Sequence, residues 1–182
     1  AFTYWLLMGI VLGTLHLYKT WNIDIYSEFK KAITSTYAVV IYLLILTGAL
    51  YFGASDYYFT GDDFTWFRWV ADSPSSITRA FSSFTDSDGF FYRPGTKLYY
   101  TLMYSVFWLN QTVYHVVSFI LHLAVSVLVF LLAKRIFKNY FLAVSTAILF
   151  ICLSGYSETI FWISSTQFLF NAFFALLALH SF

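Results

Sequence analysis

Charged side chains are scarce in this chain. They make up 10% of its 182 residues, against 60% hydrophobic and 24% aromatic residues, whereas about a quarter of the residues in a typical soluble domain are charged. The shortage excludes an ordinary soluble domain and indicates a helical membrane protein. The formal net charge of +1 gives no reason to expect a nucleic-acid partner.

Cysteine and proline are rare as well. The single cysteine, Cys152, excludes a framework of disulfide bonds within the chain. Because it lies in an apolar run, we expect a buried free thiol. Both prolines, Pro74 and Pro94, lie in a polar loop, so no proline interrupts an apolar run.

The apolar residues gather in five segments. Spanning a bilayer takes roughly 17–25 residues, and none of the segments alternates as a barrel strand does, which favours helices. We therefore predict an all-α polytopic protein, with residues 1–182 forming a single transmembrane domain of about five spans. The segments are residues 2–18, 33–55, 112–133, 139–156 and 159–182.

The two ends of the chain do not have the features expected of a protein's natural termini. It begins at Ala1 rather than a methionine and ends at Phe182 inside an apolar segment, so we expect the N-terminal piece of a longer protein. Segment 2–18 resembles a signal peptide in length, but no basic residue precedes it and no clear cleavage site follows.

Two clusters of basic residues flank the apolar segments. They are Lys19, Lys30 and Lys31, and Lys134, Arg135 and Lys138. If all five segments cross, both clusters fall on one side, which the positive-inside rule makes cytoplasmic. The loop 56–111 and the turn at Ser157–Glu158 then face the exterior. We expect a bacterial inner membrane protein with its active site outside.

The exterior loop 56–111 holds six of the nine acidic residues. After a turn at Thr60-Gly61, we expect Asp62 or Asp63 to cap a short amphipathic helix that lies on the membrane surface. The stretch 98–109 is too short to span and predicts an interfacial or re-entrant helix. The simplest interpretation of three tryptophans is that they anchor the loop at the membrane interface. They are Trp66, Trp69 and Trp108.

Two positions in this loop are candidates for chemistry. The acid pair Asp62-Asp63 exceeds what capping requires, and a carboxylate there can act as a general base or hold a divalent cation. Arg93, followed by the rigid Pro94, can bind a phosphate through its planar fork. The plainer interpretations are a helix cap for the acids and a headgroup anchor for the arginine.

Polar residues also line the later segments. His115, Ser118, His122 and Ser126 fall on one helical stripe, where hydrogen bonds between helices are the plainer role. A third ligand at helical spacing is lacking, so we expect no metal site at these histidines.

Polar residues beyond this stripe give weaker signals. Glu158 either stabilises a helix N-terminus or faces the exterior cavity. Ser164, Gln167 and Asn171 continue a polar stripe from it. The triplet Asp86-Ser87-Asp88 has the form of a metal–sugar site but is common by chance.

Together these residues resemble the GT-C class of membrane glycosyltransferases, in the branch of the protein O-mannosyltransferases and TMTC-like proteins. The resemblance covers roughly residues 33–182 and depends on an ordered pattern of short motifs. The motifs are Gly61-Asp62-Asp63-Phe64, Tyr92-Arg93-Pro94, Tyr114-His115-Val116-Val117 with Leu121-His122, and Glu158-Thr159-Ile160. The chain departs from the branch at Gly95, where leucine is usual, and at Ser154-Gly155-Tyr156-Ser157, where His-Pro is common.

The resemblance implies an inverting enzyme that moves a sugar from a polyprenyl-phosphate donor to an acceptor hydroxyl on a protein, glycan or lipid. It assigns the catalytic acid to Asp62 or Asp63, with precedent favouring Asp62, and the donor phosphate to Arg93. Secondary cavity candidates are Glu158, His115, His122 and Arg68. No cofactor is certain, and a divalent metal stays open.

Two other classes of function fit the spans. A transporter or channel piece predicts charged groups at mid-span or helices broken by glycine or proline, and the sequence has no acidic or basic residue mid-span. A non-catalytic membrane scaffold that keeps the GT-C shape is the other alternative.

Overall fold

The computed structural model describes residues 27, 35–72, 76–82, 84, 92–153 and 158–182, and these residues form helices, turns and loops. The chain separates into two compact units, Ala1–Tyr42 and Leu43–Phe182. Helix α3 (Thr36–Tyr51) crosses the boundary between them. The second unit contains every candidate residue that is described. The all-α prediction is confirmed for the described residues.

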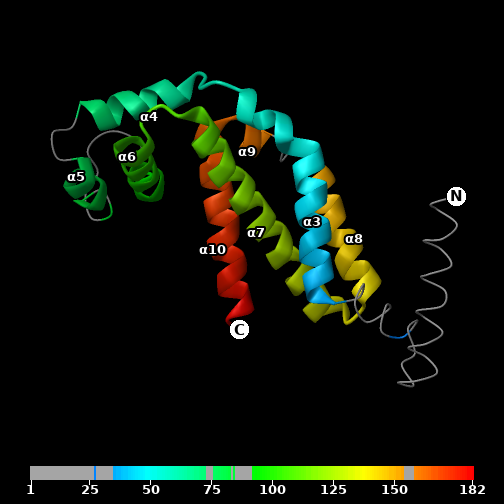
Figure 1. The fold of residues 1–182 in the computed structure, drawn as a ribbon. Coiled ribbons are helices and arrows are strands. Elements are labelled where there is room, and N and C mark those ends of the chain that lie inside the picture. The colour runs from blue at the N-terminus through cyan, green and yellow to red at the C-terminus, as the bar shows by residue number, and fades with distance from the viewer. Residues whose placement is uncertain (1–26, 28–34, 73–75, 83, 85–91, 154–157) are drawn as a thin grey trace, which may run out of the picture. The chain divides into compact units, whose positions relative to one another are not determined.

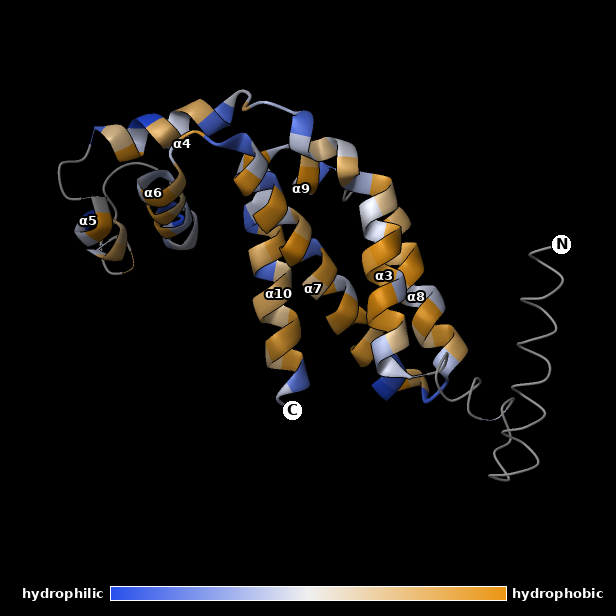
Figure 2. Cartoon of the chain, in the orientation of Figure 1, coloured by the Kyte–Doolittle hydropathy of each residue, from blue (hydrophilic) through white to orange (hydrophobic). Residues whose placement is uncertain are grey.

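Among the described residues, three helical stretches are long and apolar enough to cross a membrane. The first, Thr36–Asp56, joins α3 to the 3-10 helix η1 (Phe52–Asp56). The second is α7 (Gln111–Phe137), and the third, Ile163–His180, joins η3 (Ile163–Ser165) to α10 (Thr166–His180). Figure 2 shows hydrophobic residues along most of these helices. They match three of the five predicted segments.

The other two predicted spans have different outcomes. Segment 139–156 contains α8 (Tyr140–Cys152), which has 13 residues. At 1.5 Å per residue it is about 20 Å long, less than the roughly 30 Å of a hydrocarbon core. Segment 2–18 lies outside the described residues. Five spans therefore stay a prediction.

Helix α7 is the central element of the second unit, and it packs against both α8 and α10 (Figure 1). It runs without glycine or proline and ends where Lys138 adopts the left-handed conformation, with φ 50°. Lys134 and Arg135 in its last turn favour the negative end of the helix dipole. The side chain of Asn139 then accepts a hydrogen bond from the Leu142 N–H and starts α8. This two-residue connection folds α8 back against α7.

The described part of the loop 56–111 forms three short helices. They are α4 (Asp62–Ala71), α5 (Ser76–Ser82) and α6 (Pro94–Phe107), and α6 packs against the other two. The predicted helix after Gly61 is confirmed as α4. The helix predicted at 98–109 is confirmed but begins earlier, because Pro94 is well suited to the first turn. Its interfacial position stays a prediction.

An aromatic core holds α4 against α6 and the start of α7. Phe59 lies 4.6 Å from Phe67 and 5.1 Å from Tyr114 between ring centroids, and Trp66 stacks on Tyr100 at 5.8 Å. Such pairs contribute about 0.5–1.5 kcal/mol each beyond the area they bury.

Burial in the structure overturns two interpretations from the sequence. Trp66 and Trp69 are buried, so their role as interface anchors is wrong, whereas Trp108 is exposed. The two buried indoles lie on the side of α4 that packs against other elements. The position of α6 decides which side that is, and the local sequence does not show it. Cys152 was expected to be buried and is exposed, because it is the last residue of α8.

Candidate functional site

The acid pair lies in the first turn of α4, and neither acid is the residue that precedes the helix. That position belongs to Gly61, whose φ of 51° lies in the left-handed region where glycine carries no steric penalty. The prediction that Asp62 or Asp63 is the N-cap is therefore wrong. Both carboxylates still lie near the positive end of the helix dipole.

Asp63 is buried and accepts four hydrogen bonds. Its Oδ2 accepts from the Thr60 N–H at 3.0 Å. Its Oδ1 accepts from the Ser164 N–H at 2.7 Å, from the Ser164 hydroxyl at 2.5 Å and from the Tyr100 hydroxyl at 3.0 Å. One carboxylate thus joins the start of α4 to α6 and to η3, which is 101 residues away along the chain.

The surroundings of Asp63 keep the Tyr100 phenol protonated, so that it can donate a hydrogen bond. Burial raises the pKa of the Tyr100 phenol, and the nearby Asp63 carboxylate raises it further. The phenol therefore stays protonated and donates to the carboxylate at neutral pH. Hydrogen bonds to charged groups contribute about 1.5–3 kcal/mol each. The geometry gives Asp63 the role of a structural clamp.

Asp62 lies in the opposite environment, since its side chain is exposed. Successive helical residues point about 100° apart, so fixing Asp63 inward directs Asp62 to the surface. The clamp holds the backbone of this turn, and Asp62 therefore projects from a rigid element. A solvated carboxylate on a fixed helix turn can accept a proton from a bound hydroxyl or contribute to holding a cation.

Arg93 lies in a separate cavity of about 260 Å³. One wall is the start of α6, where Arg93 precedes the helix, and the other is the first turns of α10. The Thr96 hydroxyl donates to the Gln167 side-chain oxygen at 3.4 Å and so joins the two walls. The lining residues are Tyr92, Arg93, Pro94, Gly95, Thr96, Gln167, Phe170 and Asn171.

This cavity combines a cation with amide side chains. A guanidinium offers five donors in a fixed fork, and each amide offers two donors and an acceptor. That set can bind a phosphate and neighbouring hydroxyl groups. Gln167 and Asn171 belong to the polar stripe seen in the sequence, and the fold brings them to Arg93.

The polar stripe of α7 is buried, as predicted for side chains that face the interior of a helix bundle. His115 lies with Nδ1 2.8 Å from the Ile160 carbonyl oxygen and Nε2 2.9 Å from the Tyr57 carbonyl oxygen. The hydroxyls of Ser118 and Thr166 are 2.7 Å apart. These contacts connect α7 to the residue that follows η1, to α9 (Glu158–Phe161) and to α10. Interhelical hydrogen bonding therefore accounts for the first half of the stripe.

His122 lies deeper, inside an aromatic cage. Its ring is 5.4 Å from the rings of both Tyr51 and Phe150. Within the described part of the chain, neither ring nitrogen has a hydrogen-bond partner. The Ser126 hydroxyl donates to the backbone carbonyl of His122 and does not reach the imidazole. His122 lines neither the Arg93 cavity nor the surface near Asp62.

The remaining candidates are dispersed. Glu158 is exposed and opens the four-residue helix α9. Arg68 is exposed and pairs with Asp72 at 3.5 Å, one turn along α4. Neither lines the Arg93 cavity. The triplet Asp86-Ser87-Asp88 lies outside the described residues, and the described ones contain no group of three His, Cys, Asp or Glu placed to hold a metal ion.

Two features escaped prediction from the sequence. The partners of Asp63, Tyr100 and Ser164, come from distant segments, and only the polar stripe of Ser164 gave a signal. Lys97 is buried, with Nζ 5.3 Å from the centre of the Trp69 ring. The Arg79 guanidinium lies 4.8 Å from the same ring. Nothing in the local pattern distinguished Lys97 from a solvated lysine.

Comparisons with known protein families, with curated protein sequences and with solved structures find no match to this chain.

Proposed function

We propose that this protein is a membrane glycosyltransferase that moves a sugar from a polyprenyl-phosphate donor to an acceptor hydroxyl at the exterior membrane face. The observation that carries the proposal is the division between the adjacent acids. Asp63 is buried and accepts four hydrogen bonds, and Asp62 is exposed on the turn that Asp63 fixes. A general base needs both exposure and a fixed position.

The reaction then follows from the two polar sites. Asp62 accepts the proton of the acceptor hydroxyl, whose oxygen forms a bond to the anomeric carbon of the sugar. The bond from that carbon to the phosphate oxygen breaks, and polyprenyl phosphate leaves with the bonding electrons. The acceptor gains the sugar with inverted configuration, and the released proton stays on the carboxyl group until solvent removes it.

Arg93 is assigned to the leaving phosphate. Its cavity offers the guanidinium together with Gln167 and Asn171, which suits a phosphate flanked by sugar hydroxyls. Charge stabilisation at a leaving group is frequently a larger contribution than proton transfer, and proton transfer itself contributes typically 10²–10⁴-fold.

The test is sugar transfer by the full chain in vesicles, with a polyprenyl-phosphate sugar as donor. Asp62→Asn should lower the transfer rate at least about 10²-fold, and Arg93→Gln should lower the rate and raise the donor KM. Asp72→Asn is the matched control, since Asp72 is an exposed acid at the other end of α4, and it should transfer normally. Full activity in Asp62→Asn would exclude the assigned base.

One observation favours a transporter as a second candidate. A break at Trp162 separates the short helix α9 from the third spanning stretch, which begins at η3, and discontinuous helices are common at transport sites. In this chain the Ser164 N–H at the break donates to Asp63, so a structural bond uses it. Flux of a solute into protein-containing vesicles, with no sugar transfer, would favour the transporter.

A further inference from the structure

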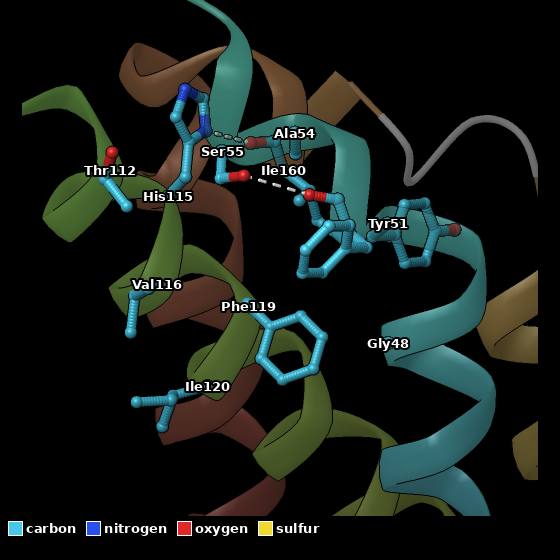
Figure 3. A pocket seen from close by; sticks show the side chains of 11 residues that line it. Gly48, Tyr51, Ala54, Ser55, Thr112, His115, Val116, Phe119, Ile120 and Ile160 are labelled. Carbon is cyan, nitrogen blue, oxygen red and sulfur yellow. Dashed lines mark hydrogen bonds between the residues drawn. The ribbon is translucent and has the colours of Figure 1, made fainter.

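A second cavity among the described residues has neither of the two acids nor Arg93 in its lining. It measures about 550 Å³ and lies between the end of α3 with η1 and the first turns of α7. Figure 3 shows the Phe119 ring directed from α7 toward the space beside Gly48. The volume falls within the roughly 300–1,000 Å³ of small-molecule sites.

The walls of this cavity are apolar. None of the described residues that line it is acidic, lysine or arginine. Three polar groups in the lining are engaged with backbone carbonyls, since the Ser55 and Tyr51 hydroxyls each donate to one and His115 contacts another. Thr112 adds one further hydroxyl, so an occupant meets mainly carbon atoms.

The cavity also opens sideways. Val116 and Ile120 line it, yet they are 46% and 56% exposed. Both of its walls belong to stretches long enough to span a bilayer, so the surroundings at this depth are lipid tails rather than water. An apolar, uncharged cleft open to lipid favours a hydrocarbon chain over a polar solute or a charged peptide.

We propose that this cavity binds one hydrocarbon chain of a membrane lipid, inserted between α3 and α7 beside Gly48. The inference requires that these two stretches cross the bilayer and does not require the assignment of Asp62. Two lipids can supply the chain, a bilayer phospholipid or the polyprenyl-phosphate donor, and the test below has one arm for each.

Gly48 makes the proposal testable without damage to the fold. A Cβ atom built at Gly48 meets no atom within 4 Å, and the same is true of Gly53. Gly48 lines the cavity, whereas Gly53 lies outside its lining on the same continuous stretch. Leucine at position 48 therefore grows into the cavity, and leucine at position 53 adds the same atoms elsewhere.

The experiment uses the full chain in vesicles of phosphatidylcholine and phosphatidylglycerol. One arm contains phosphatidylcholine with a photoreactive diazirine on an acyl chain, and the other contains a diazirine-bearing polyprenyl phosphate. After illumination, mass spectrometry locates the attached lipid. Labelling of α10 around Phe174, which is 63% exposed, measures contact with bulk lipid.

We expect at least one arm to label residues 112–120 more strongly than α10. Gly48→Leu should lower that labelling about tenfold, which corresponds to about 1.4 kcal/mol of binding, and Gly53→Leu should leave it unchanged. Whichever arm responds to Gly48→Leu identifies the source of the chain. Labelling of 112–120 that is equal in all three proteins in both arms would overturn the proposal. Such a result leaves the transfer assay of Asp62→Asn unaffected, so the two failures are distinguishable.

Discussion

The loop helices α4–α6 and the bundle helices α7, α8 and α10 are both rich in large apolar residues, but they pack them differently. The loop helices share one buried aromatic core, which includes Trp66 and Tyr100, although they also expose side chains such as Val106 at 67%. On the bundle helices many large side chains face outward, as Phe141 at 75% and Phe174 at 63% exposure illustrate. The aromatic core suits helices that pack against one another, and the outward-facing side chains of the bundle helices suit a surface in contact with lipid.

The difference indicates which helices need specific side-chain hydrogen bonds and core packing for their stability. A lipid-facing helix satisfies its own backbone and gains little from burying apolar side chains against its neighbours. A short helix in water is marginal alone, so α4 depends on its core and on the Asp63 clamp. Substitutions should therefore cost most in the loop helices and least on exposed polar positions.

The largest effect is expected at Asp63. Asp63→Ala leaves four donors without their acceptor: three are buried, one on Tyr100 and two on Ser164, and the Thr60 N–H is partly buried. Each orphaned donor costs about 1–3 kcal/mol, so the loss of stability should exceed about 3 kcal/mol. Thermal unfolding in detergent measures it, with Asp62→Ala as the matched control at under about 0.5 kcal/mol. Equal losses at the two positions would refute the clamp.

The aromatic core should give the next effect. Trp66→Ala removes a ring that is 2% exposed, and Trp108→Ala removes one that is 63% exposed. Truncating a buried tryptophan costs about 3–5 kcal/mol, and the exposed one should cost under about 1 kcal/mol in detergent. Chemical denaturation of both variants checks the ratio. Similar destabilisation by both would mean that Trp66 does not belong to a packed core.

The two buried histidines should respond with opposite sign. His115→Leu loses contacts to two carbonyl oxygens and should destabilise by about 1–3 kcal/mol. His122→Leu removes two ring nitrogens that have no partner among the described residues, and should be neutral or stabilising by about 1 kcal/mol. Melting temperatures of the two variants provide the test. Destabilisation by His122→Leu as large as by His115→Leu would indicate a partner for the His122 ring.

The smallest effect is expected at the exposed ion pair of α4. Arg68 and Asp72 are 84% and 67% exposed, and exposed pairs of this kind contribute about 0.2–1 kcal/mol before salt screens them. Arg68→Ala should change stability within that range and become neutral at high salt. A large, salt-independent loss would place Arg68 in a structural or catalytic network.

Much of the fold is predictable because lipid-exposed and buried helices have long apolar runs. The segments 33–55, 112–133 and 159–182 have counterparts of almost the same extent, since length and hydropathy are local properties. Segment 139–156 is different because its helix is shorter than its apolar run. Helix α4 was predictable from its turn and spacing, but its buried face was not, since α6 decides it.

The sequence identified the residues of the candidate site better than it identified the role of each residue. The pair Asp62-Asp63 stands out in sequence, but which acid is buried depends on Ser164, 101 residues away. Arg93 and the polar stripe of Gln167 and Asn171 could each be identified in the sequence. Only the packing of α6 near α10 places them in one cavity. Local pattern cannot supply such long-range pairings, because they depend on the path of the whole chain.

The most direct measurement is the accessibility of position 62 to water on each side of the membrane. In a Cys152→Ser background, Asp62→Cys provides a single thiol in the chain. A membrane-impermeant maleimide added to intact cells should label this thiol, because α4 is assigned to the exterior face and residue 62 is exposed. Labelling only from the cytoplasmic side, in inverted vesicles, would contradict the account.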